Sequence, residues 1–282
     1  MKVIRAEKAG FCMGVSLALK KLESCLDNNP RGNRVCSLGP LIHNPQVLER
    51  LRARGAVFLG RADDALPGDT VLIRAHGIPR ADEARLRSKA ARVEDATCPK
   101  VKRAQLAIAE ATASGASLLL FGESEHPEVR GLMSYARGEA RVFASPEELE
   151  KLAPDPDACY VLAAQTTQDR QIFQRIEREL SKRLPRLRAL HTICDATRER
   201  QDEARDLASK VDIMIVVGGK ESGNTRRLAD LAIEAGVRTW HVETPEELDS
   251  ADLDPALVAG LTAGASTPRG LIDAAERKLR EI

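Results

Sequence analysis

The chain has 282 residues, of which 43 are lysine or arginine and 42 are aspartate or glutamate, so its formal net charge is +1. This balance argues against nucleic acid or an anionic membrane as the main partner, and 3% aromatic residues are too few for a base-stacking platform. No apolar stretch approaches the ~20 residues of a membrane span, and the first seven residues carry charges where a signal peptide is apolar. We therefore expect a cytoplasmic protein that binds neither membranes nor nucleic acid.

Three of the six cysteines stand in one sequence context, after a short strand-like stretch and directly before a helical pattern. They are Cys12, Cys98 and Cys194, at roughly even spacing along the chain. Apolar residues at helical spacing follow each cysteine, as Val15 and Leu19 follow Cys12. The pattern predicts that a strand–cysteine–helix unit opens each third of the chain.

A second unit follows each cysteine and consists of a strand, a glycine, three further residues, a polar residue and a helix. The polar residue lies four positions after the glycine in all three copies, which are Gly39 to His43, Gly122 to His126 and Gly218 to Ser222. A third unit completes each repeat with a short strand and a polar loop before another helix, within residues 71–77, 160–167 and 260–268.

The alternation of strands and helices indicates an α/β protein with parallel sheets. We expect three small α/β domains related by approximate threefold repetition: residues 14–97, 98–193 and 194–282, with residues 1–13 adding a strand to the third. Ligands of open α/β sheets bind beyond the carboxyl ends of the strands, so a ring of three such domains would turn the polar loops onto one central cavity. The alternative is three independent domains with ordinary polar loops.

The repeated cysteines have the chemistry of metal ligands. Three thiolates can hold a zinc ion, or an iron–sulfur cluster with one iron left open, and a helix N-terminus favours the thiolate. We expect the other three cysteines to be structural, because Cys25 falls in an amphipathic helix, Cys159 opens a strand and Cys36 lacks the strand–helix context.

Polar side chains in the loops of the second and third units suit an anionic group. They are three imidazoles, two hydroxyls and one amide, from His43, His76, His126, Ser222, Ser266 and Asn224. Together with the free N–H groups of helix N-termini, these donors suit a phosphate or a diphosphate. The sequence contains neither a P-loop nor a dinucleotide-binding fingerprint, so nucleotide binding is not indicated.

One carboxylate accompanies this set of donors. Glu128 stands two residues after His126. A carboxyl group beside an anion and a metal centre would hold its proton at neutral pH, which is what a proton donor requires. The alternative is an ordinary acidic residue in the first turn of a helix, where the helix dipole favours it.

At these residues the sequence resembles the 4-hydroxy-3-methylbut-2-enyl diphosphate reductase family, also called IspH or LytB. This family catalyses the last step of the non-mevalonate route to isoprenoids. The resemblance covers the full length of the chain. It rests on nine ordered motifs: residues 9–12, 40–44, 75–77, 95–99, 126–128, 165–167, 193–194, 222–225 and 263–266.

The resemblance implies a cloverleaf of three α/β domains around a 4Fe–4S cluster, with Cys12, Cys98 and Cys194 as ligands and one iron open. It implies an iron–sulfur oxidoreductase that removes the allylic hydroxyl of its substrate to give isopentenyl and dimethylallyl diphosphates. Electrons would come from ferredoxin or flavodoxin. Thr166 would orient the substrate hydroxyl and Glu128 would deliver protons. The implied ligands of the substrate diphosphate are His43, His76, His126, Ser222, Asn224 and Ser266.

One position departs from a common pattern of the family, because Gly223 stands where many members have serine. The backbone N–H of Gly223 can replace that hydroxyl, since glycine permits a close approach. From the residues alone, two other function classes stay open. One is a zinc-dependent phosphohydrolase or lyase that uses the same three cysteines, and the other is a non-catalytic phosphate-binding protein.

Overall fold

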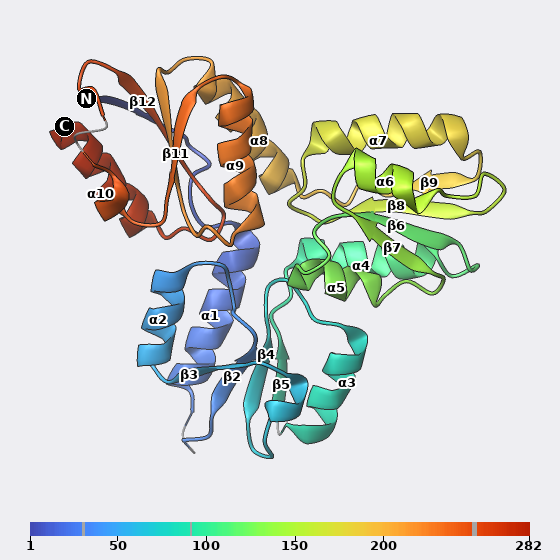
Figure 1. Ribbon diagram of the computed structural model, residues 1–282. Helices are drawn as coiled ribbons and strands as arrows, with labels where there is room; N and C mark the ends of the chain where they lie inside the picture. Colours follow the sequence, from blue (N-terminus) through green and yellow to red (C-terminus); the bar gives the residue numbers. More distant parts are fainter. Residues whose placement is uncertain (30–31, 91, 250–252) are drawn as a thin grey trace. The chain divides into compact units, whose positions relative to one another are not determined.

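The structure is a computed structural model that describes residues 1–29, 32–90, 92–249 and 253–282 (Figure 1). None of the described helices is both long enough and apolar enough to cross a membrane. Two helices, α1 (Met13–Asp27) and α2 (Pro45–Ala53), contribute residues to both of the compact units into which the chain divides. The first unit consists of Met1–Val15, His43–Glu49 and Asp195–Ile282, and the second of Ser16–Ile42 and Arg50–Cys194.

The first unit contains one four-stranded sheet in which all neighbouring strands run parallel. Its strand order is β1 (Lys2–Arg5), β12 (Val258–Ala263), β10 (Ile213–Val217) and β11 (Arg238–Val242). Every residue of β10 is buried, as is typical of a parallel strand that helices cover on both faces. The helices of this unit are α8 (Asp195–Ala208), α9 (Gly223–Glu234), the short 3₁₀ helix η2 (Pro245–Glu247) and α10 (Arg269–Glu281).

The second unit contains two further parallel four-stranded sheets. One has the strand order β3 (Ala56–Leu59), β2 (Val35–Leu38), β4 (Thr70–Ile73) and β5 (Arg92–Asp95). The other has the order β7 (Ala140–Phe143), β6 (Ser117–Phe121), β8 (Tyr160–Ala164) and β9 (Leu187–Ala189). The helices are η1 (Ala62–Asp64), α3 (Arg80–Lys89), α4 (Pro99–Ala111), α5 (Pro127–Met133), α6 (Pro146–Leu152) and α7 (Arg170–Arg183).

Strand β6 shows how these sheets are stabilised. Its alternate side chains enter two separate apolar cores, with Leu118 and Leu120 in one and Leu119 and Phe121 in the other. Successive side chains of a strand point to opposite faces, so the sheet is buried on both sides. This double burial explains why the sequence of β6 is an unbroken apolar run after its first residue rather than an alternating pattern.

The three sheets share one topology. In each, the strand that precedes the repeated cysteine (β1, β5 or β9) forms one edge, and the other two predicted strands form the centre. The predicted α/β class, with parallel sheets repeated three times, is therefore confirmed. The boundaries of the three domains stay a prediction.

The opposite edge of each sheet carries a strand that the sequence analysis misses. These edge strands are β3, β7 and β11, and each is followed by a short helix, η1, α6 or η2. They pair with a neighbour on one side only and are partly exposed, so they contain few fully buried residues. A short, half-buried strand leaves too weak an apolar pattern to be recognised from spacing alone.

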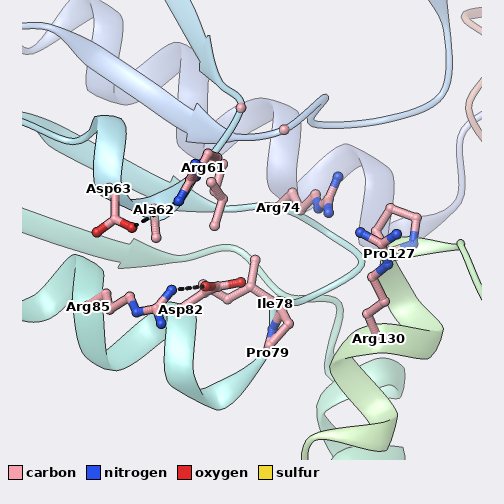
Figure 2. A pocket seen from close by; sticks show the side chains of 13 residues that line it. Arg61, Ala62, Asp63, Arg74, Ile78, Pro79, Asp82, Arg85, Pro127 and Arg130 are labelled. Carbon is pink, nitrogen blue, oxygen red and sulfur yellow. Dashed lines mark ion pairs between the residues drawn. The ribbon is translucent and has the colours of Figure 1, made fainter.

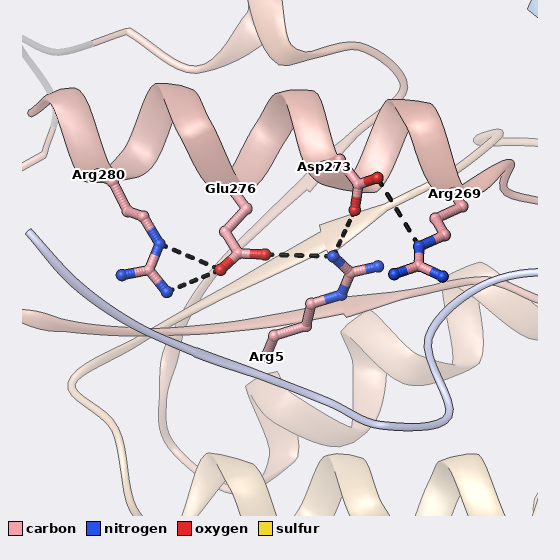
Figure 3. Close-up of polar contacts among 5 residues, drawn as sticks. All are labelled: Arg5, Arg269, Asp273, Glu276 and Arg280. Atoms are coloured by element: carbon pink, nitrogen blue, oxygen red, sulfur yellow. Dashed lines mark hydrogen bonds and ion pairs between the residues drawn. The ribbon is translucent and has the colours of Figure 1, made fainter.

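An ion-pair network attaches β1 to α10 in the first unit (Figure 3). One nitrogen of Arg5, Nη1, lies 2.6 Å from Asp273 Oδ1 and 3.2 Å from Glu276 Oε2. On α10 itself, Arg280 reaches Glu276 at 2.7 Å and Arg269 lies 3.8 Å from Asp273. The Arg5 guanidinium lowers the pKa of Asp273, while Arg280 first and then Arg5 lower the pKa of Glu276.

This network predicts a pH-dependent contribution of Arg5 to stability. Carboxylates with lowered pKa values in the folded state stabilise the protein above their unfolded-state pKa values of about 4, and the effect disappears as pH falls through the lowered values. We expect Arg5→Gln to reduce the free energy of unfolding at about pH 7, and the difference from the wild type to shrink toward about pH 3. Urea unfolding at several pH values measures this, with the highly exposed Arg269→Gln as a control expected to show a smaller change. A difference that is constant with pH would contradict the prediction.

Candidate active site

The predicted site residues lie in loops at the carboxyl ends of the central strands. In each sheet the chain runs from the strand that precedes the repeated glycine (β2, β6 or β10) to an edge strand (β3, β7 or β11). It then returns to the strand on the other side of the first one (β4, β8 or β12). A topological switch point therefore lies between β2 and β4, between β6 and β8, and between β10 and β12. Open α/β sheets bind their ligands at such points, so each of these three pairs of loops is a candidate ligand-binding region of its own sheet.

Each of the three repeated cysteines directly precedes a helix. Cys12 precedes α1, Cys98 is the N-cap of α4 and Cys194 precedes α8. Their backbone N–H groups donate to equivalent carbonyl oxygens, each two residues beyond the end of a central strand. The N···O distances are 3.2, 2.9 and 3.0 Å, and the acceptors, in the same order, are Ala265, Ala75 and Thr166.

The repeat thus gives the three thiols one equivalent position, beside the loop that follows a central strand. None of the three is in a disulfide, and all three are partly exposed. A set of three cysteine side chains matches the ligand preference of zinc and of iron–sulfur clusters. The donor set therefore fits the cluster that the resemblance implies.

The other three cysteines lie away from these positions. Cys36 is fully buried in β2, where burial and then the nearby Asp69 carboxylate raise the pKa of its thiol to about 11. Burial also raises the pKa of Cys25, which lies within α1. Cys159 is exposed and precedes β8. A thiol that holds its proton is a poor metal ligand, which supports structural roles for Cys25 and Cys36.

Close packing explains the glycine that recurs four positions before each polar residue. An added Cβ atom would lie within 2.8 Å of a neighbouring side chain at each position: Gly39 against Arg74, Gly122 against Val129 and Gly218 against Thr267. A side chain at Gly122 or Gly218 would displace Val129 or Thr267. At Gly39 the end of the Arg74 side chain could move aside, but the φ of +74° still favours glycine. The shared spacing therefore reflects a shared way of seating these loops at the switch points.

Helix α5 positions two of the predicted site residues. His126 is its N-cap, and the Nδ1 atom of His126 accepts the backbone N–H of Glu128 at 3.1 Å. In the neutral imidazole the proton must then be on Nε2, which can donate to an oxygen of a ligand. The His126 ring meets the His76 ring edge to face, with centroids 5.3 Å apart. The loops after β4 and β6 thus bring two predicted histidines together.

The carboxyl group of Glu128 is buried against Thr166. Glu128 is 2% exposed, its Oε1 accepts the Thr166 backbone N–H at 2.6 Å, and its Oε2 accepts the Thr166 hydroxyl at 2.9 Å. Burial raises the pKa of Glu128 to about 7, although both hydrogen bonds act in the opposite direction. A carboxyl group with this pKa holds a proton on a large fraction of molecules at neutral pH, as the predicted proton donor must.

The first unit carries the other predicted ligands of the anion. Ser222 is the N-cap of α9 and accepts the N–H of Thr225 at 3.4 Å, so its own hydroxyl proton is left to donate. Asn224 is 5% exposed, and its Nδ2 has no hydrogen-bond partner within the described part of the chain. An added Cβ at Gly219 would lie 2.6 Å from the carbonyl oxygen of His43, so the loop after β10 packs on the backbone there.

The loop after β12 completes this arrangement. Ser266 is 8% exposed and follows Ala265, whose carbonyl accepts the N–H of Cys12. The next residue, Thr267, donates its hydroxyl to the last carbonyl of β10 at 2.9 Å. Gly223 is the first residue of α9, so its N–H is among those that a helix start leaves without a helical partner. This placement agrees with the backbone contact expected of Gly223.

Sequence reasoning missed Arg200, which supports the Cys12 loop. Arg200 lies on α8, is 6% exposed, and donates from Nη2 to the Gly10 carbonyl at 2.8 Å. Gly10, two residues before Cys12, has φ of +107°, a conformation that favours glycine. The available signal was the helical spacing of Arg200 with the apolar residues Ala204 and Leu207, which places all three on the buried face.

The fold is that of an α/β protein whose polar loops and repeated cysteines follow the strands of three parallel sheets. The family model described as LytB protein matches residues 3–280. The chain belongs to the LytB family, and the resemblance inferred from its motifs is confirmed.

Relatives of known name match this chain over its full length. The 4-hydroxy-3-methylbut-2-enyl diphosphate reductase of Desulfovibrio desulfuricans is 56% identical over 286 residues, and the match covers 100% of both chains. The protein of the same name from Aquifex aeolicus is 40% identical over 283 residues, which cover 99% of this chain and 96% of that protein.

Two solved structures share the fold. A structure of (E)-4-hydroxy-3-methyl-but-2-enyl diphosphate reductase, described as the terminal enzyme of the non-mevalonate pathway, is 39% identical, covers 100% of both chains and has a TM-score of 0.71. The E-1-hydroxy-2-methyl-but-2-enyl-4-diphosphate reductase of Plasmodium falciparum is 25% identical and has a TM-score of 0.91, with 98% of this chain and 87% of that chain covered.

Proposed function

We propose that this chain is a 4-hydroxy-3-methylbut-2-enyl diphosphate reductase. The observation that carries the proposal is full-length identity of 56% to a relative of that name. The chemistry of the site supports it, because the buried carboxyl group of Glu128, with a pKa of about 7, is hydrogen-bonded to Thr166 at a sheet switch point. The reaction adds two electrons and two protons to the allylic alcohol and releases water and an isoprenoid diphosphate.

We propose that Cys12, Cys98 and Cys194 hold a 4Fe–4S cluster, one per chain, with the fourth iron open. Their equivalent positions in the three repeats support this assignment. When bound, such a cluster supplies single electrons and a Lewis-acidic iron. The electron donor that we propose is a ferredoxin or a flavodoxin, and the cytoplasmic location stays a prediction.

The residues of the chain then bind, orient and protonate the substrate. Donors from His43, His76, His126, Ser222, Asn224 and Ser266 would hold the diphosphate, and the buried amide of Asn224 supports this role because it has no partner within the described residues. The Thr166 hydroxyl would orient the substrate hydroxyl, and its hydrogen bond to Glu128 supports this role. Glu128 holds the proton at its carboxyl group until it is transferred to the allyl carbon or to the departing oxygen.

The proposed function is tested with protein purified in the absence of oxygen. We expect a brown protein that contains iron and sulfide and that consumes the allylic alcohol diphosphate when a chemical reductant is supplied. A colourless zinc protein with hydrolase activity would contradict the cluster and the reaction together. A protein that binds phosphate compounds without any reductive turnover would instead indicate a binding protein.

A separate prediction concerns the diphosphate ligands, which are mostly neutral donors. Ser266→Ala and His43→Ala should each weaken substrate binding by about tenfold while the iron content is unchanged, since each variant removes one hydrogen bond to a charged oxygen. A monophosphate analogue should bind much more weakly than the diphosphate, and affinity should depend only modestly on salt. Equal affinity for monophosphate and diphosphate analogues, measured by calorimetry, would rule out the proposed set of ligands.

A further inference from the structure

A pocket lined by arginines lies in the second unit, at the carboxyl ends of β2, β3 and β4 (Figure 2). Its volume is about 200 Å³. The arginines are Arg61 after β3, Arg74 after β4, Arg85 on α3 and Arg130 on α5. The proposed reaction uses none of them, so their convergence on one pocket requires a separate explanation.

Two of these arginines already have carboxylate partners within the pocket. Arg61 lies 3.6 Å from Asp63, and Arg85 lies 3.7 Å from Asp82. Arg74 differs from them, because among the described residues it forms no ion pair and its buried Nε has no hydrogen-bond partner. In Figure 2 the dashed lines join the first two pairs, and none reaches Arg74.

Arg74 is also held close to the protein and to a second cation. An added Cβ atom at Gly39 would lie 2.5 Å from Arg74 Nη1, so the guanidinium packs directly on the loop after β2. Burial and then the charge of Arg130 lower the pKa of Arg74 to about 10, although the Asp82 carboxylate acts in the opposite direction. Arg130 pairs with Glu125, but both of these side chains are more than half exposed. A partly buried cation with a like charge beside it is an arrangement that an anion would stabilise.

We propose that this pocket binds an oxyanion of the phosphate class, held by Arg74 and Arg130. The planar guanidinium group presents paired N–H donors that match two oxygens of a phosphate, and two such groups from different elements fix its position. A volume of about 200 Å³ is below that of an ordinary organic ligand site. The pocket therefore suits the free ion or the terminal phosphate of a monoester. This proposal goes beyond the proposed function and does not depend on it.

The location of the pocket connects it to the candidate active site through short stretches of backbone. Arg74 lies two residues before His76, and Pro127, which lines the pocket, directly follows His126. The two sites are nevertheless formed by different side chains. Binding of phosphate at one can therefore be separated from binding at the other by substitution of Arg74 and Arg130.

The test is calorimetric titration of the anaerobically purified protein with inorganic phosphate, with ionic strength held constant by chloride. Arg74→Met keeps an unbranched apolar stem and removes the guanidinium group with its charge. Arg130→Gln is the second variant, on the more exposed side of the pocket. Arg87→Gln is the matched control, because Arg87 pairs with Glu83 on α3 and does not line the pocket.

We expect the wild type and Arg87→Gln to bind one more phosphate per chain than Arg74→Met. Arg130→Gln should bind that phosphate about tenfold more weakly. Titration with AMP distinguishes the two sources of the anion: binding that depends on Arg74 indicates a phosphate monoester, and binding of inorganic phosphate alone indicates the free ion. Identical phosphate stoichiometry and affinity in the wild type, Arg74→Met and Arg130→Gln would overturn the proposal.

Thermal unfolding provides a second readout that a purely structural arginine would not change. Phosphate should raise the midpoint of the wild type, since a ligand that binds only the folded state stabilises it. The rise should be smaller for Arg74→Met at the same phosphate concentration. An equal rise in both proteins would mean that all phosphate binds elsewhere, and the pocket would then have no role as an anion site.

Discussion

Replacing Glu128 by glutamine is expected to lower turnover by about a hundredfold or more while substrate binding is retained. Glutamine has nearly the same size, and its carbonyl oxygen can still accept the Thr166 N–H that Glu128 accepts at 2.6 Å. Its amide can donate to the Thr166 hydroxyl, so the buried pair keeps both hydrogen bonds. Only the transferable proton is lost, which isolates proton delivery from binding and from electron transfer.

The measurement is steady-state turnover with a chemical reductant, together with iron content and substrate affinity. Glu125→Gln is the matched control, because Glu125 lies in the same loop and its side chain is 83% exposed. We expect the control to retain turnover and Glu128→Gln to retain its iron and its affinity. Near-normal turnover in Glu128→Gln would reduce Glu128 to a helix-start residue and move the proton source to Thr166, to water or to the substrate diphosphate.

Glu128 is also expected to make the turnover of the enzyme depend on pH. Burial raises the pKa of Glu128 to about 7, and the acid form is the one that donates. Turnover of the wild type should therefore fall as pH rises above about 7. The effect on stability has the same direction: the folded state binds this proton more tightly than the unfolded state, so the contribution of Glu128 declines between about pH 4 and pH 7 and is constant above that range. In Glu128→Gln the residual turnover should lose this decline.

Much of the fold could be predicted from the sequence because the three repeats share the same order of strands and helices and similar residues at the strand ends. The central strands are buried on both faces, and double burial produces the continuous apolar runs of β6, β8 and β10. The edge strands β3, β7 and β11 escaped prediction because partial exposure relaxes the choice of residues and, unlike the edge strands β1, β5 and β9, they precede no repeated cysteine.

The candidate site shows the same division between what spacing reveals and what only packing reveals. The histidines and hydroxyls could be placed because each follows a central strand at a repeated offset, and the cysteines because each stands between an edge strand and a helix. The partner of Glu128 could not be placed by spacing, since Thr166 is 38 residues away and meets it only when β8 lies beside β6. The role proposed for Arg74 in binding an anion was likewise not evident from the sequence, because an arginine after a strand is ordinarily exposed to solvent.

Substitution of any one of the three repeated cysteines is expected to have the largest effect on the iron content of the protein. Cys98→Ser keeps the shape of the α4 N-cap and its N–H bond to Ala75, but replaces a soft thiolate by a hydroxyl that binds iron poorly. We expect iron to fall from about four atoms per chain to a small fraction of that, together with the brown colour and the reductive turnover. The same result is expected for Cys12→Ser and Cys194→Ser, because the three thiols hold equivalent positions.

The matched controls are the cysteines that the structure places elsewhere. Cys159→Ser alters an exposed side chain, and Cys36→Ala alters a thiol that burial keeps protonated, with a pKa of about 11. Both variants should retain nearly all of their iron and turnover, and Cys36→Ala should lose only a modest amount of stability from the small cavity it creates. Iron and sulfide analysis with visible absorbance distinguishes the two groups. A different set of thiols would hold the metal if Cys98→Ser kept its full iron content, or if a folded Cys36→Ala protein lost the cluster. In either case the equivalence of the three repeats would have no bearing on the cofactor.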